Sequence, residues 1–349
     1  MSRLYVPKPF SAGVLLTYKC TNECRHCMYA CSPKWGSDWI DLKSAEKILE
    51  TFSKSFREYY PEDFNQVGVN IGLHFTGGEP FLNFDLLLKL VEAASSHSIP
   101  SIFVETNCFW CINDNVTEEK LTELKKSGLD GILISANPFV VEQTPFERIE
   151  RAAKISRRIF GRNAIIYQES FFNQMMSIGL KGTISFEEYL LMMSKRDPLG
   201  LYYGLSYPSM LLMGRLPYRL GHLYRKRPAR EFFGESCLEE LTRNWHVHVD
   251  NYYNYITGYC AGISLGDARE LETLCQDGID LDEHPIIGRL TSFEGIKKLF
   301  IYASENYGYK ERENGYISKC HLCLDIRKHI VSQTNDFEEL RPREFYKHL

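Results

Sequence analysis

Residues 19–29 read KCTNECRHCMY and bring together three cysteines, Cys20, Cys24 and Cys27. Spacings of four and three residues let one loop wrap a cubic iron–sulfur cluster. Because a 4Fe–4S cube normally takes four cysteines, three ligands leave one iron open to a small molecule. Zinc is the alternative on spacing alone, with His26 or Cys31 as its fourth ligand. We interpret Cys31 as a non-ligand, since the trio is already complete.

Bulk properties limit the class of protein. The 349 residues suffice for one large domain and a smaller one, and a net charge of −4 leaves no basic surplus for general nucleic-acid binding. The N-terminus lacks the apolar core of a signal peptide, and no run of about 18 apolar residues predicts a membrane span. These features predict a cytoplasmic protein. Disulfides rarely persist in the cytoplasm, so the clustering of eight of the eleven cysteines favours metal ligation.

Strand and helix patterns alternate through the first two thirds of the chain. Strands are expected at 13–18, 67–75, 101–105, 131–135, 164–168 and 201–207, and helices at 42–56, 85–94, 117–127, 145–160 and 185–194. Six such units imply parallel strands with right-handed crossovers. We therefore predict an α/β fold, a partial (β/α)6 barrel of TIM type, with its chemistry at the carboxyl ends of the strands. The pattern breaks after Arg215, which predicts a barrel over 1–225 and a smaller α+β, cysteine-containing extension over 226–349.

A second motif, HFTGGEPF at residues 74–81, follows the second expected strand. Gly77 and Gly78 let the backbone approach a ligand closely, and Glu79 offers a carboxylate for an ammonium group. On its own the stretch also fits a tight turn between a strand and a helix.

The cysteine trio and this glycine motif together resemble the radical S-adenosylmethionine (SAM) superfamily over about residues 14–215. The resemblance implies that Cys20, Cys24 and Cys27 hold a 4Fe–4S cluster. It also implies that Gly77, Gly78 and Glu79 receive the methionine part of SAM.

Three weaker elements extend the resemblance. ETNCFW at 105–110 is similar to a polar turn of the family and makes Asn107 a candidate SAM contact, with Cys108 where glycine is usual. ISAN at 134–137 is similar to a ribose contact, carried by Ser135 and Asn137. MGRL at 213–216 makes Arg215 a candidate partner for the SAM carboxylate. The alternatives are ordinary turn residues and a surface arginine.

Four further cysteines lie beyond the expected barrel. Residues 245–267 alternate like a β-hairpin and end near Cys260, SKCHLC carries Cys320 and Cys323, and Cys237 stands upstream. The set resembles a Twitch extension, half of a SPASM domain, which implies a second 4Fe–4S cluster. A structural zinc and unliganded thiols are the alternatives. Cys275 is the alternative to Cys237 as the fourth ligand, and we expect His246 and His248 to be hairpin residues rather than zinc ligands.

The resemblance implies an enzyme of oxidoreductase or lyase type. Reductive cleavage of SAM would yield a 5′-deoxyadenosyl radical that takes hydrogen from a substrate. A flavodoxin or ferredoxin would supply the electron. We expect a peptide or protein substrate, with a small metabolite or nucleobase-like molecule as the alternative. No membrane partner is expected. The rival of another class is a non-enzymatic zinc or iron–sulfur protein, which would have no use for Glu79 after a double glycine.

Overall fold

The computed structural model describes residues 2–61 and 64–349. Two compact units make up the chain. The barrel unit comprises residues 10–24 and 31–210, and the C-terminal unit comprises residues 2–9, 25–30 and 211–349. The predicted domain boundary at 225 therefore lies inside the C-terminal unit. No helix in the described part of the chain is both long and apolar enough to cross a membrane.

Five parallel strands form the sheet of the barrel unit, in the order β6-β5-β4-β3-β2. They are β2 (Ser11–Leu15), β3 (Gly72–Thr76), β4 (Ile102–Thr106), β5 (Gly131–Ser135) and β6 (Ala164–Tyr167). Each strand is the sequence neighbour of the next, so each carboxyl end sends its loop to the same edge. This arrangement confirms the predicted α/β class and the first five strands of the predicted barrel.

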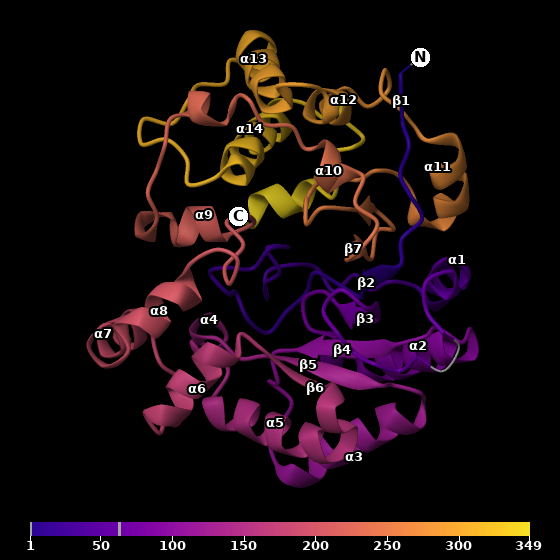
Figure 1. The fold of residues 1–349 in the computed structure, drawn as a ribbon, viewed down its shortest axis with the longest axis vertical. Coiled ribbons are helices and arrows are strands. Elements are labelled where there is room, and N and C mark those ends of the chain that lie inside the picture. Colours follow the sequence, from indigo (N-terminus) through magenta and orange to yellow (C-terminus); the bar gives the residue numbers. More distant parts are fainter. Residues whose placement is uncertain (1, 62–63) are drawn as a thin grey trace. The chain divides into compact units, whose positions relative to one another are not determined.

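Helices connect the strands and cover the sheet. They are α1 (Leu42–Arg57), α2 (Phe84–Ser96), α3 (Asp114–Lys126), α4 (Pro138–Val141), α5 (Phe146–Phe160), α6 (Glu169–Ser177), α7 (Phe186–Arg196) and α8 (Pro198–Leu205). Figure 1 shows α2, α3 and α5 along one side of the strands. Their apolar faces bury residues such as Leu90, Leu124 and Ile149. This burial supplies the hydrophobic stabilisation of the unit.

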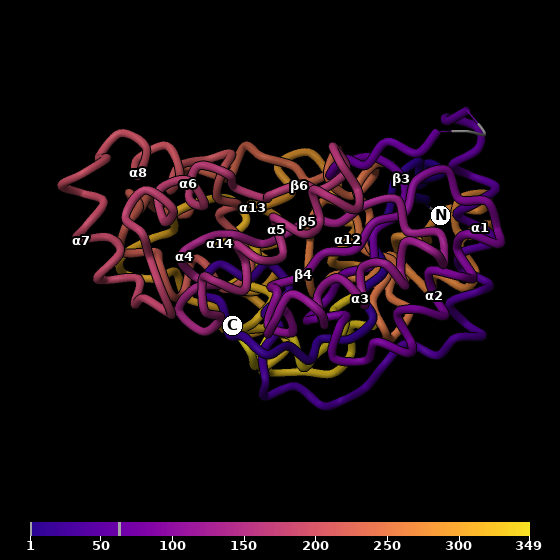
Figure 2. The backbone as a smooth tube through the Cα atoms, turned by 90° about the horizontal axis from the view of Figure 1, so that it is seen from below, coloured from indigo at the N-terminus to yellow at the C-terminus, as the bar shows by residue number. Residues whose placement is uncertain are grey.

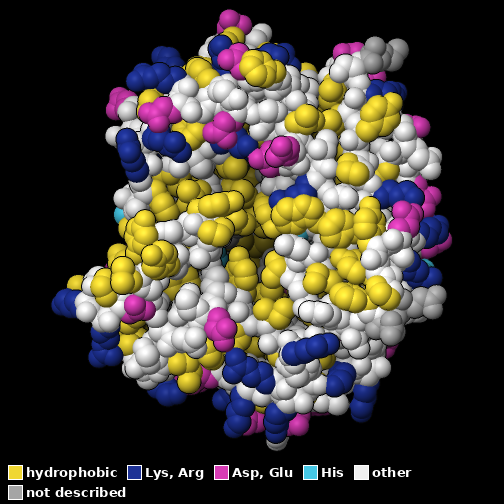
Figure 3. Space-filling model, viewed as in Figure 1, with side chains coloured by type: hydrophobic (Ala, Val, Ile, Leu, Met, Phe, Trp, Pro, Cys, Tyr) yellow, Lys and Arg dark blue, Asp and Glu magenta, His cyan; other side chains and the backbone are white. Residues whose placement is uncertain are grey.

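The last turns of α3 and α5 are basic. Lys125 and Lys126 stand in the last turn of α3, and Arg157 and Arg158 in the last turn of α5. Figure 3 shows Lys and Arg side chains gathered over this region. Cations near helix C-termini are favourable because they oppose the negative end of the helix dipole.

The sixth predicted strand, at 201–207, is wrong. This stretch lies largely in α8, where Pro198 occupies the first turn and Asp197 accepts a hydrogen bond from the Gly200 backbone N–H. Only Leu201 and Gly204 of the helix are buried, a spacing of three residues that suits a helix lying on α6. Figure 2 shows α6, α7 and α8 together at one end of the barrel unit. Ser185 and Glu188 form a capping box that begins α7, the helix expected at 185–194.

The C-terminal unit mixes short strands and helices. Its elements are β1 (Arg3–Leu4), α9 (Leu216–Arg219), α10 (Leu238–Leu241), β7 (Val247–Val249), β8 (Tyr255–Ile256), α11 (Leu271–Asp277), β9 (Ile279–Asp280), α12 (Pro285–Thr291), α13 (Gly295–Tyr307) and α14 (Lys319–Gln333). Strands β7 and β8 pair in antiparallel fashion, which confirms the predicted hairpin, and β1 pairs with β9. Helices α12, α13 and α14 pack on one another in sequence order.

Candidate functional site

The double glycine packs against the chain that leads into Cys20. Gly78 N donates to Thr17 O at 2.7 Å, and Glu79 N donates to Lys19 O at 3.0 Å. A Cβ atom on Gly78 would lie 1.8 Å from Lys19 O, and one on Gly77 would lie 2.5 Å from Thr17 O. Glycine is therefore required at both positions by a close backbone approach, and the motif positions the cysteine loop directly.

Two N–H donors point at the sulfur of Cys20. The Asn22 backbone N lies 3.4 Å from the sulfur, and Asn107 Nδ2 lies 3.6 Å from it. Hydrogen bonds of this kind stabilise a thiolate and tune the potential of an iron–sulfur cluster. The donor chemistry at Cys20 therefore fits a cluster ligand.

Asn22 is a residue that sequence reasoning missed. Its Nδ2 donates to Val140 O at 3.2 Å and to Thr144 Oγ1 at 3.0 Å, which ties the cysteine loop to the region of α4. The side chain is 2% exposed. The available signal was an asparagine directly inside the cysteine loop, a residue type that often hydrogen-bonds backbone groups in tight turns.

Glu79 is fully buried and accepts three hydrogen bonds. Its Oε1 accepts from Thr106 Oγ1 at 2.9 Å and from Phe81 N at 3.2 Å, and its Oε2 accepts from Asn107 N at 2.8 Å. Burial raises the pKa of Glu79 to about 7, against the lowering effect of these hydrogen bonds. The carboxyl group thus joins the loop after β3 to the loop after β4.

The loop after β4 holds Asn107 in place with unusual backbone geometry. Cys108 has a φ of 64°, in the region where glycine is usual. Trp110 stacks on Phe81 at 4.0 Å between ring centroids and donates to Thr106 Oγ1 at 3.0 Å. Cys108 and Cys111 are both fully buried, and burial raises the pKa of Cys108 well above its usual range, so that thiol is neutral.

The loop after β5 carries the other two candidate SAM contacts. Asn137 is 1% exposed and caps α4, with Oδ1 accepting from Val140 N at 3.1 Å. Its Nδ2 donates to Gln168 Oε1 at 2.9 Å. Ser135 is half-buried at the end of β5. A ribose contact by these residues stays a prediction, and the cap gives Asn137 a structural role beside it.

Cys27 and Arg215 meet within the C-terminal unit. Arg215 N donates to Cys27 O at 3.0 Å, its Nη2 donates to Ala30 O at 2.6 Å, and its Nε donates to His348 O at 3.0 Å. Arg215 is 1% exposed, so the alternative of a surface arginine is wrong. The guanidinium thus hydrogen-bonds the backbone after the third cysteine. A contact between Arg215 and the SAM carboxylate stays a prediction.

Four cysteines of the C-terminal unit line one cavity. Cys237, Cys260, Cys320 and Cys323 surround a small cavity of about 30 Å³ that is partly open to solvent. Burial raises the pKa of Cys260 and that of Cys320 to about 12, with neighbouring thiols adding to the effect. Cys275, the alternative to Cys237, lies on α11 and does not line this cavity.

Two cations that sequence reasoning missed border the same cavity. Lys319 Nζ donates to Glu240 Oε1 at 2.6 Å and to Ser236 O at 3.1 Å, and Arg327 Nη1 donates to Ala261 O at 3.1 Å. Both side chains line the cavity with the cysteines. A metal group held by four thiolates is anionic, and two fixed cations would offset its charge. The donor set therefore fits a four-thiolate metal group.

His246 and His248 pack as hairpin side chains. Both are buried, their rings lie 4.9 Å apart, and the His246 ring lies 4.9 Å from that of Tyr259. The rings pack edge to face within the C-terminal unit, and the expectation that they are not zinc ligands stays a prediction.

The N-terminal part of the chain matches a known family. Residues 14–159 match the family model of the Radical SAM superfamily. The chain carries a radical SAM domain. The matched segment begins in β2 and ends in α5, so it includes the cysteine trio, the glycine motif and the loops after β4 and β5. This domain is an enzyme domain whose cofactors are a 4Fe–4S cluster and SAM.

Individual relatives are more distant. An uncharacterized protein of Methanocaldococcus jannaschii is 26% identical over 243 residues, covering 62% of this chain and 77% of the relative. The structure of BtrN in complex with AdoMet and 2-DOIA aligns with a TM-score of 0.42 and 14% identity, covering 85% of this chain and 93% of BtrN. Native anSMEcpe with bound AdoMet aligns with a TM-score of 0.40 and 13% identity, covering 92% and 97%.

Proposed function

We propose that this radical SAM enzyme modifies a peptide or protein substrate and that Cys20, Cys24 and Cys27 hold its catalytic cluster. The observation that carries the assignment of the cluster ligands is the pair of N–H donors on the Cys20 sulfur, from Asn22 and Asn107. These donors belong to the loops that the double glycine and Glu79 hold against each other. A purely structural zinc site would not need the buried carboxylate that follows the double glycine.

When bound, the cluster and SAM supply a 5′-deoxyadenosyl radical that removes a hydrogen atom from the substrate. The chain's own residues orient and shield this chemistry. Gly77 and Gly78 bring the loop backbone against the cysteine loop, Glu79 offers its carboxylate to the SAM ammonium, and Asn107 donates to a ligand sulfur. Ser135 and Asn137 are the proposed ribose contacts, and Arg215 the proposed carboxylate contact.

The test is anaerobic SAM cleavage. Reconstituted full-length protein with SAM and dithionite should release 5′-deoxyadenosine, measured by chromatography. Cys24→Ala should abolish the product because it removes a cluster ligand, whereas Cys275→Ala, a cysteine on α11, should leave it unchanged. Product formation by Cys24→Ala at the wild-type rate would overturn the assignment.

We further propose that Cys237, Cys260, Cys320 and Cys323 hold a second 4Fe–4S cluster in a Twitch-like extension. Support comes from the shared cavity and from the two cations beside it, Lys319 and Arg327. Thiols whose pKa is raised by burial release their protons when a metal binds, so cluster loading would stabilise this unit. Relatives with such an extension modify peptides, proteins and small metabolites, so a small metabolite is the second candidate substrate.

We also propose a compartment and an electron donor for this enzyme. None of the eleven cysteines forms a disulfide, which suits the reducing cytoplasm. We place the enzyme there, with a flavodoxin or ferredoxin as its electron donor and an oxidoreductase or lyase outcome.

A further inference from the structure

Exposed apolar side chains are concentrated in the part of the barrel unit that contains α6, α7 and α8. Fourteen large apolar or aromatic side chains of the described chain are exposed, and six of them lie between residues 176 and 207. These six are Met176, Leu191, Leu199, Tyr202, Tyr203 and Tyr207. Figure 3 shows apolar side chains gathered over α8, and Figure 2 places the three helices together at one end of the unit. Such a concentration of exposed apolar surface marks an interaction site.

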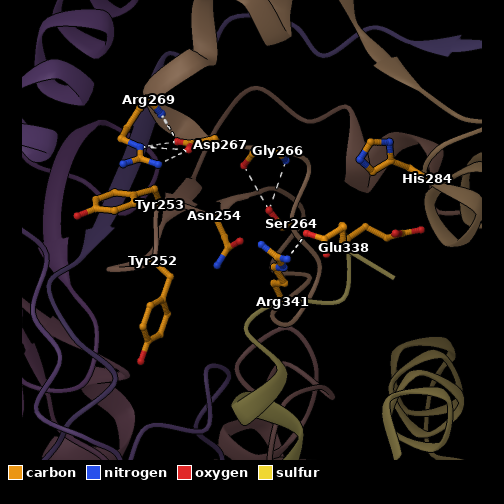
Figure 4. A pocket seen from close by; sticks show the side chains of 11 residues that line it. Tyr252, Tyr253, Asn254, Ser264, Gly266, Asp267, Arg269, His284, Glu338 and Arg341 are labelled. Carbon is orange, nitrogen blue, oxygen red and sulfur yellow. Dashed lines mark hydrogen bonds and ion pairs between the residues drawn. The ribbon is translucent and has the colours of Figure 1, made fainter. Parts of the chain in front are cut away.

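The other eight exposed side chains are spread over the rest of the chain. Tyr252, for example, borders a polar cavity of about 280 Å³ in the C-terminal unit (Figure 4). The arginines of that cavity are already paired, Arg269 with Asp267 and Arg341 with Glu338. Apolar side chains that are exposed singly are normal in a folded protein and need no partner. The surface that needs one is therefore that of α7 and α8.

Helix α8 carries apolar side chains on its solvent face as well as on its buried face. Leu201 and Gly204 are buried, whereas Leu199, Tyr202 and Tyr203 are 69%, 66% and 66% exposed. Their spacing of three and four residues places these three side chains on one side of the helix. The rings of Tyr202 and Tyr203 lie edge to face, with 5.5 Å between their centroids. Tyrosine is enriched among the residues that contribute most to protein–protein binding, so this face suits a protein partner.

Helix α7 adds a charged stripe to this surface. Glu187, Leu191 and Lys195 are exposed at intervals of four residues and so follow one side of the helix. The glutamate and the lysine are eight residues apart, about 12 Å along the axis, whereas charges pair within one helix at a spacing of three or four residues. The opposite side of the helix is buried through Phe186, Tyr189 and Met193.

The stripe on α7 is complementary to a second copy of itself. If two α7 helices lie antiparallel about a two-fold axis beside Leu191, each Glu187 faces Lys195 of the partner subunit and the two leucines face each other. A two-fold interface requires this relation, in which one residue contacts a second and the second contacts the first. A parallel arrangement would instead bring like charges together, which is unfavourable.

We propose that the face formed by α7 and α8 is the interface of a two-fold symmetric dimer of this chain, with the two α7 helices antiparallel. The exposed leucine and tyrosines supply apolar area, and the two Glu187–Lys195 pairs set the orientation. A different protein would give no reason for an acid and a base placed symmetrically about Leu191. The interface requires neither SAM nor a cluster, so its test is independent of the radical chemistry.

The experiment measures the mass of the full chain by sedimentation equilibrium over a range of concentrations. Wild type should approach twice the 40.5 kDa of one chain. Lys195→Glu should weaken dimerisation by about tenfold or more, because symmetry brings two acidic pairs into each dimer. Glu187→Lys should do the same with two basic pairs, and the double variant should recover the wild-type affinity. Lys43→Glu, the same charge change on α1 at the other end of the barrel unit (Figure 2), should dimerise like wild type.

A mixture of the two single variants tests the antiparallel geometry. Across the proposed interface, the new lysine of one chain meets the new glutamate of the other, and the unchanged Lys195 meets the unchanged Glu187. The mixture should therefore dimerise more tightly than either variant alone, by about tenfold or more. Tyr203→Ser should separately weaken the wild-type dimer by about tenfold or more, because it removes exposed aromatic area and leaves the buried face of α8 intact.

Three results would overturn the proposal. A wild-type chain that stays monomeric at about 100 μM would leave this face to a different protein. A dimer that neither Lys195→Glu nor Tyr203→Ser weakens would form through another surface. A mixture of the single variants that dimerises no better than each alone would exclude the antiparallel pairing of α7. A thermal melt of each variant checks that it is folded.

Discussion

Glu79 shows how one side chain can serve the fold and the chemistry together. Its carboxyl group accepts three hydrogen bonds and so joins the loop after β3 to the loop after β4. One of the three donors is the backbone N–H of Asn107. The motif alone indicated an ammonium receptor. The structure adds a structural role for the same carboxyl group, because an isolated buried carboxylate would be too costly without these donors.

SAM binding should depend on pH through Glu79. The folded pKa of about 7 lies above the usual 4.5, so the carboxyl group is neutral below pH 7 and charged above it. If the charge receives the SAM ammonium, affinity should rise as pH increases from 6 to 8 and fall by up to about tenfold per pH unit below 7. Glu79→Gln should weaken binding by roughly tenfold to a hundredfold near pH 8 and flatten the profile. Calorimetric titration of reconstituted protein measures both effects.

A separate measurement identifies any loss of loop structure in the same variant. The glutamine amide would face the Asn107 N–H, donor against donor, which costs about 1–3 kcal/mol of unfolding free energy. Urea unfolding reports this loss, and Glu46→Gln, an exposed position on α1, is the matched control. A wild-type SAM affinity that stays constant from pH 6 to 8 would contradict the ammonium contact and leave Glu79 as a structural residue.

At the scale of elements, the carboxyl ends of neighbouring strands bring the polar loops of the barrel unit together. β3 lies between β2 and β4, so the glycine loop that leaves β3 contacts the cysteine loop after β2 and the Asn107 loop after β4. Parallel strand order, rather than proximity in sequence, therefore decides which loops contact the cysteines.

Asn107→Ala should alter the reduction potential of the cluster and keep the backbone hydrogen bond between residue 107 and Glu79. The substitution removes the N–H that lies 3.6 Å from the Cys20 sulfur, but it keeps the backbone N–H that binds Glu79. Losing a hydrogen bond to a ligand sulfur should make the reduction potential more negative and lower the rate of SAM cleavage by about tenfold. An EPR-monitored redox titration measures the first effect.

The control for this variant is Asn113→Ala, which removes a helix N-cap at the start of α3 instead. It should lower stability by about 1 kcal/mol and leave the potential unchanged. An unchanged potential in Asn107→Ala would mean that the amide positions its other partners, Thr21 and the Phe109 backbone N–H, rather than tuning the cluster.

At the scale of the whole molecule, the proposed function divides seven of the cysteines between two metal sites. The proposed catalytic site uses the trio near the N-terminus, and the proposed second set spans positions 237 to 323. Full reconstitution should therefore give about eight irons per chain, since each cube holds four. The triple variant with Cys20, Cys24 and Cys27 changed to Ala should keep about four, measured by iron and sulfide analysis.

The metal content of the triple variant also tests the alternative of a structural zinc. A triple variant that contains zinc, or no metal at all, would contradict a second cluster and favour a structural zinc or free thiols. Replacing Cys275, which lies outside the cavity, should leave the iron content unchanged, whereas Cys237→Ala in the triple variant should remove the remaining iron.

Local sequence patterns determined several strands and helices of this protein and both of its N-terminal motifs. The apolar run at 131–135 forms β5 with the predicted bounds, because a short buried strand is encoded in consecutive apolar residues. Ser185 and Glu188 begin α7 as their spacing predicts. The cysteine trio and the double glycine also stand in short continuous motifs, so the amino-acid order alone makes them recognisable. The strand predicted at 201–207 was wrong because apolar residues suit a strand and a half-buried helix alike. The Asp197 cap and Pro198 in the first turn favour the helix.

Only the tertiary structure decided which distant residues meet. Cys237 rather than Cys275 joins Cys260, Cys320 and Cys323, although both were possible by composition. The Asn107 amide on the Cys20 sulfur joins positions 87 residues apart, and the hydrogen bond from Ile286 N to Glu339 Oε1 joins positions 53 residues apart. Periodicity and motifs report interactions between near neighbours in the chain. Hydrogen bonds and burial across long separations depend on how the elements pack, and no local pattern records that.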